Sequence, residues 1–104
     1  MTKYEVLVSE QAQRDLKEIA NYLSSNLLES NIAKAILSEI DKSILSLEEM
    51  PHRYCLVSDN LLNKVGLRKL IVKNYIVFFK VFETKKTVGI VRIMHSRRNW
   101  QKII

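Results

Sequence analysis

The sequence predicts an α+β fold: a short N-terminal strand, an antiparallel two-helix hairpin, and a three- to four-stranded antiparallel sheet on which the hairpin packs. Apolar residues recur at helical spacing through most of the first half, whereas the second half contains three closely spaced runs of branched and aromatic side chains. The 104 residues are 47% hydrophobic and include only two glycines and one proline. We therefore expect residues 1–104 to form a single domain around one core.

Two helices are expected between the first strand and the proline. Residues 3–8 alternate and are rich in branched and aromatic side chains, as in a strand. Ser9 is a suitable N-cap for a first helix that ends near residues 24–26. Its apolar positions share one face: Ala12, Leu16, Ile19, Ala20 and Leu23. A second amphipathic helix is expected over residues 30–49, because Pro51 then prevents its continuation.

Three strands are expected after a loop-like stretch, residues 52–65. Residues 67–72, 75–82 and 87–94 are dense in Val, Ile, Leu and Phe. The connections between them are short enough for hairpins. The second half therefore predicts an antiparallel meander.

The middle strand of this meander is apolar on both faces. One face carries Tyr75, Val77, Phe79 and Val81, and the other carries Ile76, Phe78 and Phe82. A helical hairpin covers only one face of a sheet. The second face is expected either to bind a partner or to lie under the 52–65 loop or the C-terminal tail, and the sequence leaves both alternatives open.

The net charge of +6 is unevenly distributed. Residues 1–50 contain five basic and nine acidic residues, a net of −4, and residues 51–104 contain twelve basic and two acidic residues, a net of +10. This asymmetry predicts a positive face made by the second half, which favours an acidic partner. The single Cys55 excludes an intrachain disulfide framework and a zinc cluster. The single cysteine also favours a reducing compartment, so we expect a cytoplasmic protein. No apolar run approaches membrane-spanning length, so we expect no membrane contact. No metal or cofactor is expected.

Basic and aromatic side chains gather at the end of the last predicted strand. Arg92, His95, Arg97, Arg98 and Trp100 lie within nine residues, and Arg68, Lys69 and Lys73 from the preceding hairpin are expected nearby. Arginine binds phosphate oxygens, tryptophan stacks on bases and histidine transfers protons near neutral pH, so the cluster suits a phosphodiester or an anionic target surface. The alternatives are a solvated strand end for the arginines, a structural His95 and a packed Trp100.

Strand parity constrains this cluster. In an uninterrupted strand, Arg92 shares a face with Ile90 and Met94, whereas His95 lies on the opposite face with Ile93. Arg92 and His95 therefore reach one groove only if the strand ends or bulges near Met94.

Four segments resemble the RelE/ParE superfamily of bacterial toxin–antitoxin toxins. They are residues 66–70 (GLRKL), 74–81 (NYIVFFKV), 91–100 (VRIMHSRRNW) and 15–23 (DLKEIANYL). The resemblance covers nearly the whole chain. It implies a toxin held inactive by a cognate antitoxin, whose acidic C-terminal segment wraps the apolar and basic surfaces. The implied antitoxin-binding residues are Tyr75, Val77, Phe79 and Val81.

The resemblance leaves two targets open. RelE-like members cleave messenger RNA on the ribosome, which would assign phosphate stabilisation to Arg68 and Arg98 and acid or base catalysis to His95. The Gly-Tyr-Arg of that branch stands here as residues 74–76, Asn-Tyr-Ile, so one expected arginine is missing. ParE-like members poison DNA gyrase without known catalytic residues. The sequence favours gyrase, with messenger cleavage as the alternative and a non-toxic nucleic-acid-binding module as a third hypothesis.

Overall fold

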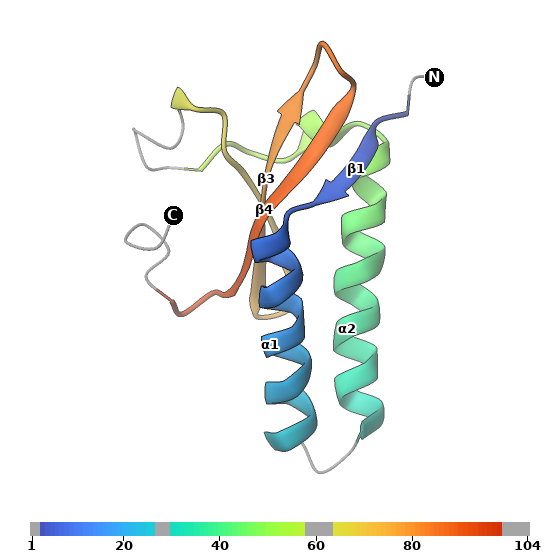
Figure 1. Cartoon of the computed structure of the whole chain (residues 1–104), viewed down its shortest axis with the longest axis vertical. Helices are drawn as coiled ribbons and strands as arrows, with labels where there is room; N and C mark the ends of the chain where they lie inside the picture. The colour runs from blue at the N-terminus through green and yellow to red at the C-terminus, as the bar shows by residue number, and fades with distance from the viewer. Residues whose placement is uncertain (1–2, 27–29, 58–63, 99–104) are drawn as a thin grey trace.

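The computed structural model describes residues 3–26, 30–57 and 64–98 of the chain. Its elements are β1 (Glu5–Val8), α1 (Glu10–Asn26), α2 (Ser30–Leu45), the short 3₁₀ turns η1 (Ser46–Glu48) and η2 (Pro51–Arg53), β2 (Arg68–Val72), β3 (Tyr75–Phe82) and β4 (Thr87–His95). The two helices lie side by side as an antiparallel hairpin and extend well beyond one end of the sheet (Figure 1). The α+β prediction is confirmed.

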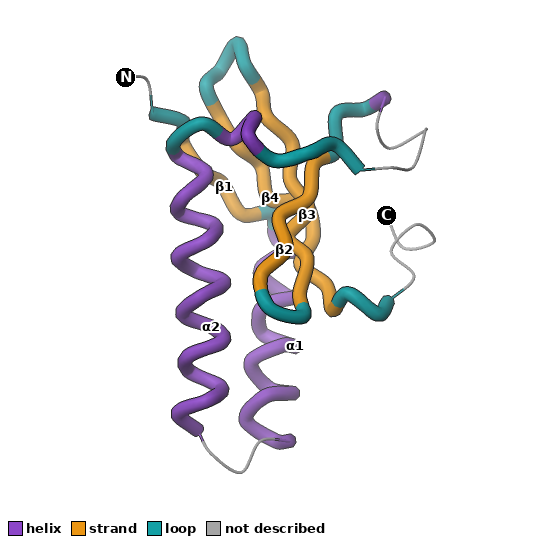
Figure 2. Tube along the Cα trace, turned by 180° about the vertical axis from the view of Figure 1, so that it is seen from behind, coloured by secondary structure: helices purple, strands orange, loops and turns teal. Residues whose placement is uncertain are grey.

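The four strands form a mixed sheet in the order β1-β4-β3-β2. The meander β2-β3-β4 is antiparallel as predicted, but β1 pairs with β4 in parallel. The expectation of a purely antiparallel sheet is therefore wrong. A parallel pair needs a long connection, and here the helical hairpin followed by β2 and β3 joins β1 to β4. The strand order can be followed from behind in Figure 2.

The predicted element boundaries agree closely with the structure. The Ser9 hydroxyl accepts a hydrogen bond from the Ala12 N–H at 3.0 Å, which confirms the N-cap of α1. The second α-helix ends at Leu45, earlier than predicted, because the chain tightens into the 3₁₀ turn η1 before Pro51.

The inner face of the sheet packs against the helices. Tyr75, Val77 and Phe79 of β3 are 5% or less exposed and share one cluster with side chains of both helices. Val81 is half-buried against the same cluster. The four residues expected to bind an antitoxin thus belong to the core on the inner face, so they do not form an open docking surface.

Part of the outer face is covered by the chain itself. Leu56 forms a bridge with Arg68 at the edge of β2, and Val57 then packs on the outer side with Phe78 and Met94. Of the alternatives left open by the sequence, cover by the 52–65 loop is therefore found over this part of the sheet, through Leu56 and Val57.

Within the described ranges, no helix has the length and apolar character to cross a membrane.

Candidate functional site

A β-bulge in β4 sets the direction of the residues that follow it. Phe79 pairs with Ile90 but Phe78 pairs with Arg92, so Val91 is the extra residue. The bulge lies three residues before the predicted position. Because of it, His95 lies opposite Tyr75, on the inner face.

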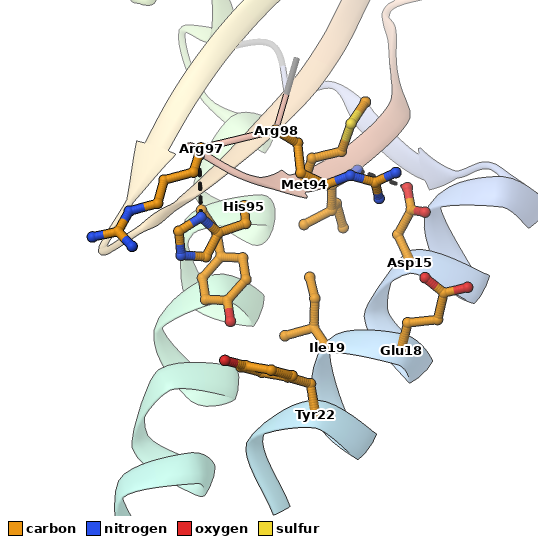
Figure 3. A pocket seen from close by; sticks show the side chains of 10 residues that line it. Asp15, Glu18, Ile19, Tyr22, Met94, His95, Arg97 and Arg98 are labelled. Carbon is orange, nitrogen blue, oxygen red and sulfur yellow. Dashed lines mark hydrogen bonds between the residues drawn. The ribbon is translucent and has the colours of Figure 1, made fainter. Parts of the chain in front are cut away.

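A pocket of about 450 Å³ opens between α1 and the end of β4 (Figure 3). Asp15, Glu18, Ile19, Tyr22, Tyr75, Ile93, Met94, His95, Arg97 and Arg98 line it. Ile19 and Tyr22 reach into it from α1, and the arginines come from the segment that follows β4 (Figure 3). Two of the three residues predicted for catalysis, His95 and Arg98, are therefore brought together.

The Tyr75 ring and the Arg97 backbone hold His95 in one orientation. The Tyr75 ring meets the His95 ring edge to face, with centroids 5.4 Å apart and planes at 78°. The Arg97 backbone N–H donates to His95 Nδ1 at 3.1 Å, so a neutral ring carries its proton on Nε2. Burial raises the pKa of Tyr75, and the neighbouring Tyr22 adds to this effect. Tyr75 is therefore a neutral phenol at neutral pH.

Asp15 ties α1 to β4 beside this pocket. Its side chain is 3% exposed. It accepts hydrogen bonds from Arg92 Nε at 2.8 Å, Arg92 Nη2 at 3.1 Å, the Ile93 N–H at 2.9 Å and Gln11 Nε2 at 3.2 Å. Burial alone would raise the pKa of Asp15, but the hydrogen bonds from Arg92, Ile93 and Gln11 and the charge of Arg92 leave it lowered. The buried carboxylate thus stays ionised and fixes the strand that carries His95.

Asp15 is not among the residues predicted from the sequence, although its position in α1 carries a signal. Ala12, Leu16 and Ile19 define the apolar stripe of α1, and residue 15 lies on the same side of the helix. A carboxylate at a core position is rare unless it is paired. Its partner, Arg92, was predicted to bind phosphate.

Arg68 is also engaged away from the pocket. Its Nη1 donates to the Tyr54 carbonyl oxygen at 2.6 Å. In the sheet Arg68 lies opposite Phe79, whereas His95 lies opposite Tyr75. Four residues of strand separate those positions, roughly 13 Å at about 3.3 Å per residue. The third residue predicted for catalysis therefore lies away from the other two.

The remaining predicted contact residues are dispersed. Arg97 and Arg98 are exposed at the pocket. Lys73 lies in the turn between β2 and β3, with a φ of 56°, and Lys69 lies on the outer face. Trp100 is outside the described residues. Across the described part of the chain, no three His, Cys, Asp or Glu side chains are grouped to hold a metal ion.

The fold resembles several solved toxin structures. A chromosomal ParDE system from P. aeruginosa superposes with a TM-score of 0.72 and 18% identity, over 91% of this chain and 98% of that one. The RelBE2 toxin–antitoxin complex from Mycobacterium tuberculosis superposes with a TM-score of 0.63 and 22% identity, over 91% of this chain and 93% of that one. A mutant of the E. coli toxin RelE in the free state superposes with a TM-score of 0.61 and 16% identity, over 97% of this chain and 92% of that one.

Sequence comparison supplies the family. No curated protein matches the chain. The model of the ParE toxin of the type II toxin–antitoxin system parDE matches residues 6–100. This match spans nearly all of the sheet and both helices, and the chain therefore belongs to the ParE toxin family.

Proposed function

We propose that this toxin arrests growth by inhibiting DNA gyrase, that it acts in the cytoplasm, and that a cognate antitoxin neutralises it. The separation of the basic side chains is the observation that favours gyrase over RNA as the target. Cleavage of RNA needs several cationic groups around one phosphate, because negative charge develops there in the transition state. Here Arg92 is bound to Asp15 and Arg68 to a backbone carbonyl at a distance from His95.

The pocket suits a protein target. Tyrosine and arginine dominate the energetic centres of protein interfaces, where they surround an inserted side chain of the partner. Tyr22 is 60% exposed at the pocket, and Arg97 and Arg98 are exposed beside it. We infer that a side chain of gyrase enters between Tyr22 and His95 while the two arginines contact acidic groups around it.

A supercoiling assay tests this proposal. The purified chain should inhibit supercoiling of relaxed plasmid by gyrase. Tyr22→Ala and Arg98→Ala should each raise the half-inhibitory concentration by roughly tenfold or more, as expected for central interface residues. Lys34→Ala, at an exposed position of α2 away from the pocket, is the matched control and should have no effect. Uninhibited gyrase together with cleavage of ribosome-bound messenger would overturn the proposal.

Messenger cleavage is the second candidate, and the pairing of His95 with Tyr75 favours it. An imidazole with Nε2–H, a neutral phenol and Arg98 in one pocket are groups that can transfer protons and stabilise a phosphate. If this activity exists, His95→Ala should abolish it in a ribosome-dependent cleavage assay while the melting temperature stays unchanged. Robust growth on expression of the folded chain without antitoxin would instead support the non-toxic nucleic-acid-binding hypothesis.

The proposed antitoxin partner is supported by the family and by the solved relatives. The P. aeruginosa neighbour is a ParDE system, and the M. tuberculosis neighbour is a toxin bound to its antitoxin. The excess positive charge of the second half of this chain favours an acidic partner segment.

A further inference from the structure

The outer face of the sheet has an apolar groove at the end that the chain leaves uncovered. The register places Leu7, Gly89 and Lys80 side by side in one row across β1, β4 and β3. Phe82 and Thr87 stand in the adjoining row. Since Gly89 has no side chain, the middle of the first row is hollow.

The Phe82 ring forms one wall of this hollow. A Cβ built on Gly89 would lie 3.2 Å from Phe82 Cε2, so the ring reaches over the glycine. Leu7, Val8, Ser9, Phe82, Gly89, Ile90 and Val91 line a groove of about 290 Å³. Leu7 and Phe82 remain 52% and 49% exposed. Two large apolar side chains thus flank a surface cavity that is large enough to hold a partner's side chain.

The charges near the groove indicate the chemistry of its occupant. Lys80 stands in the same row as Gly89, and Lys69 lies opposite Phe78 on the same face. Within the described ranges neither lysine makes an ion pair. Glu5, in the row of Phe82, is an acidic group on the same face. Glu10 and Glu83 follow the lining residues Ser9 and Phe82 in the chain, and they are paired with Arg14 and with Lys86 and His52. The rim is therefore net positive next to an apolar floor.

We propose that this groove is a docking site for the cognate antitoxin, through a segment that inserts an apolar side chain between Leu7 and the Phe82 ring and places carboxylates beside Lys80 and Lys69. The buried apolar surface would supply affinity, and the lysines would fix the orientation of the segment. This inference rests on the antitoxin part of the proposed function and is independent of gyrase as the target.

Photo-crosslinking tests the location. The photoreactive amino acid benzoylphenylalanine would replace Leu7 or Phe82, and in control proteins Ile32 or Leu45, which are 47% and 59% exposed on α2. Each protein would be co-expressed with the product of the gene adjacent to its own. Crosslinks to that product should form from positions 7 and 82 and not from 32 and 45. Crosslinks from α2 alone, crosslinks joining two copies of this chain, or a failure of that product to bind at all would overturn the proposal.

Added negative charge tests whether the groove binds an apolar and acidic segment. Leu7→Glu should weaken binding of the same product by at least roughly tenfold in calorimetry, as for loss of a central apolar contact. Glu5 already stands on this face of β1, so a glutamate at position 7 is compatible with the fold. Lys80→Glu should weaken binding less and reduce its dependence on salt. Leu45→Glu is the control.

A supercoiling assay shows whether the antitoxin docking site and the proposed gyrase contact are independent. Leu7→Glu should inhibit supercoiling as strongly as the unmodified chain, because Leu7 is not part of the His95 pocket. Binding of the antitoxin that is unaffected by both Leu7→Glu and Lys80→Glu would overturn the docking site whatever the supercoiling result.

Discussion

Two carboxylates collect hydrogen bonds from distant parts of the chain, and they differ in burial. Asp15 is 3% exposed, whereas the side chain of Glu83 is 56% exposed. Asp15 joins α1 to β4 through Gln11, Arg92 and Ile93, and Glu83 joins the N-terminal segment to η2 and the β3–β4 turn through Tyr4, His52 and Lys86. Water competes for the bonds of Glu83 and is largely kept from those of Asp15. The number of bonds to a carboxylate therefore does not measure its contribution to stability.

The largest effect is expected from removing Asp15. Asp15→Ala leaves the Arg92 guanidinium, part-buried against α1, without its counter-ion and leaves the Ile93 N–H without its acceptor. Breaking a buried pair costs about 3–5 kcal/mol, so urea unfolding should show a loss of that order. A loss no larger than that of a Glu83 variant would contradict the comparison.

Removing both partners of the buried pair should cost less. In Asp15→Leu combined with Arg92→Leu, no charge is left unpaired, and apolar replacements of buried ion pairs are often neutral. We expect the double variant to be roughly 1–3 kcal/mol more stable than Asp15→Leu alone, so the two changes should be non-additive in a double-mutant cycle. Strict additivity of the two single changes would show that the pair does not act as a unit.

Acid should remove the stability that the ionised Glu83 side chain contributes to the fold. Hydrogen bonds from Lys86, His52 and Tyr4 lower the pKa of Glu83 to about 2, from 4.5 in an unperturbed glutamate. Because the folded pKa is the lower one, the carboxylate contributes stability above pH 4.5 and loses it as the pH falls from about 4.5 to about 2. The difference in melting temperature between the unmodified chain and Glu83→Gln should therefore shrink over that range. A constant difference from pH 6 to pH 2 would contradict the linkage.

The smallest effect is expected from Tyr4→Phe. The Tyr4 hydroxyl lies 3.0 and 2.8 Å from the two oxygens of Glu83, but these bonds are exposed. Water replaces the lost hydroxyl, and the ring stays packed against the core. The melting temperature should change less than in Glu83→Gln, and far less than in Asp15→Ala.

Local sequence patterns predicted the helices and strands, but they did not predict which distant strands pair. The dense run of branched and aromatic residues 75–82 and the short turn before it define β3 with its observed bounds. The direction of β1 depends on how the chain returns after two helices, and no residue within β1 encodes that path. Periodicity placed Tyr75 and Phe79 on a common face, but it could not say which face the helices cover.

The candidate site shows the same division. The dense charge from Arg92 to Arg98 lies at the end of β4 where His95, Arg97 and Arg98 line one pocket. The predicted roles of Arg92 and Arg68 depended on distances between strands and helices. Arg92 is bound by Asp15, and Arg68 is bound by a carbonyl of the preceding loop. The spacing of residues along the chain does not predict either contact.

The bulge at Val91 has a consequence for how the length of β4 can change. Residues on both sides of Val91 keep the faces that they would have if it were absent, because it is the extra residue in the ladder. Deleting Val91 would thus leave Ile90, Arg92 and His95 on their present faces. A deletion within the regular pairing at Gly89 would reverse the faces on one side of it. β4 therefore has one position where the chain can shorten without turning His95 out of its pocket, and homologues that differ in length here should differ at this position.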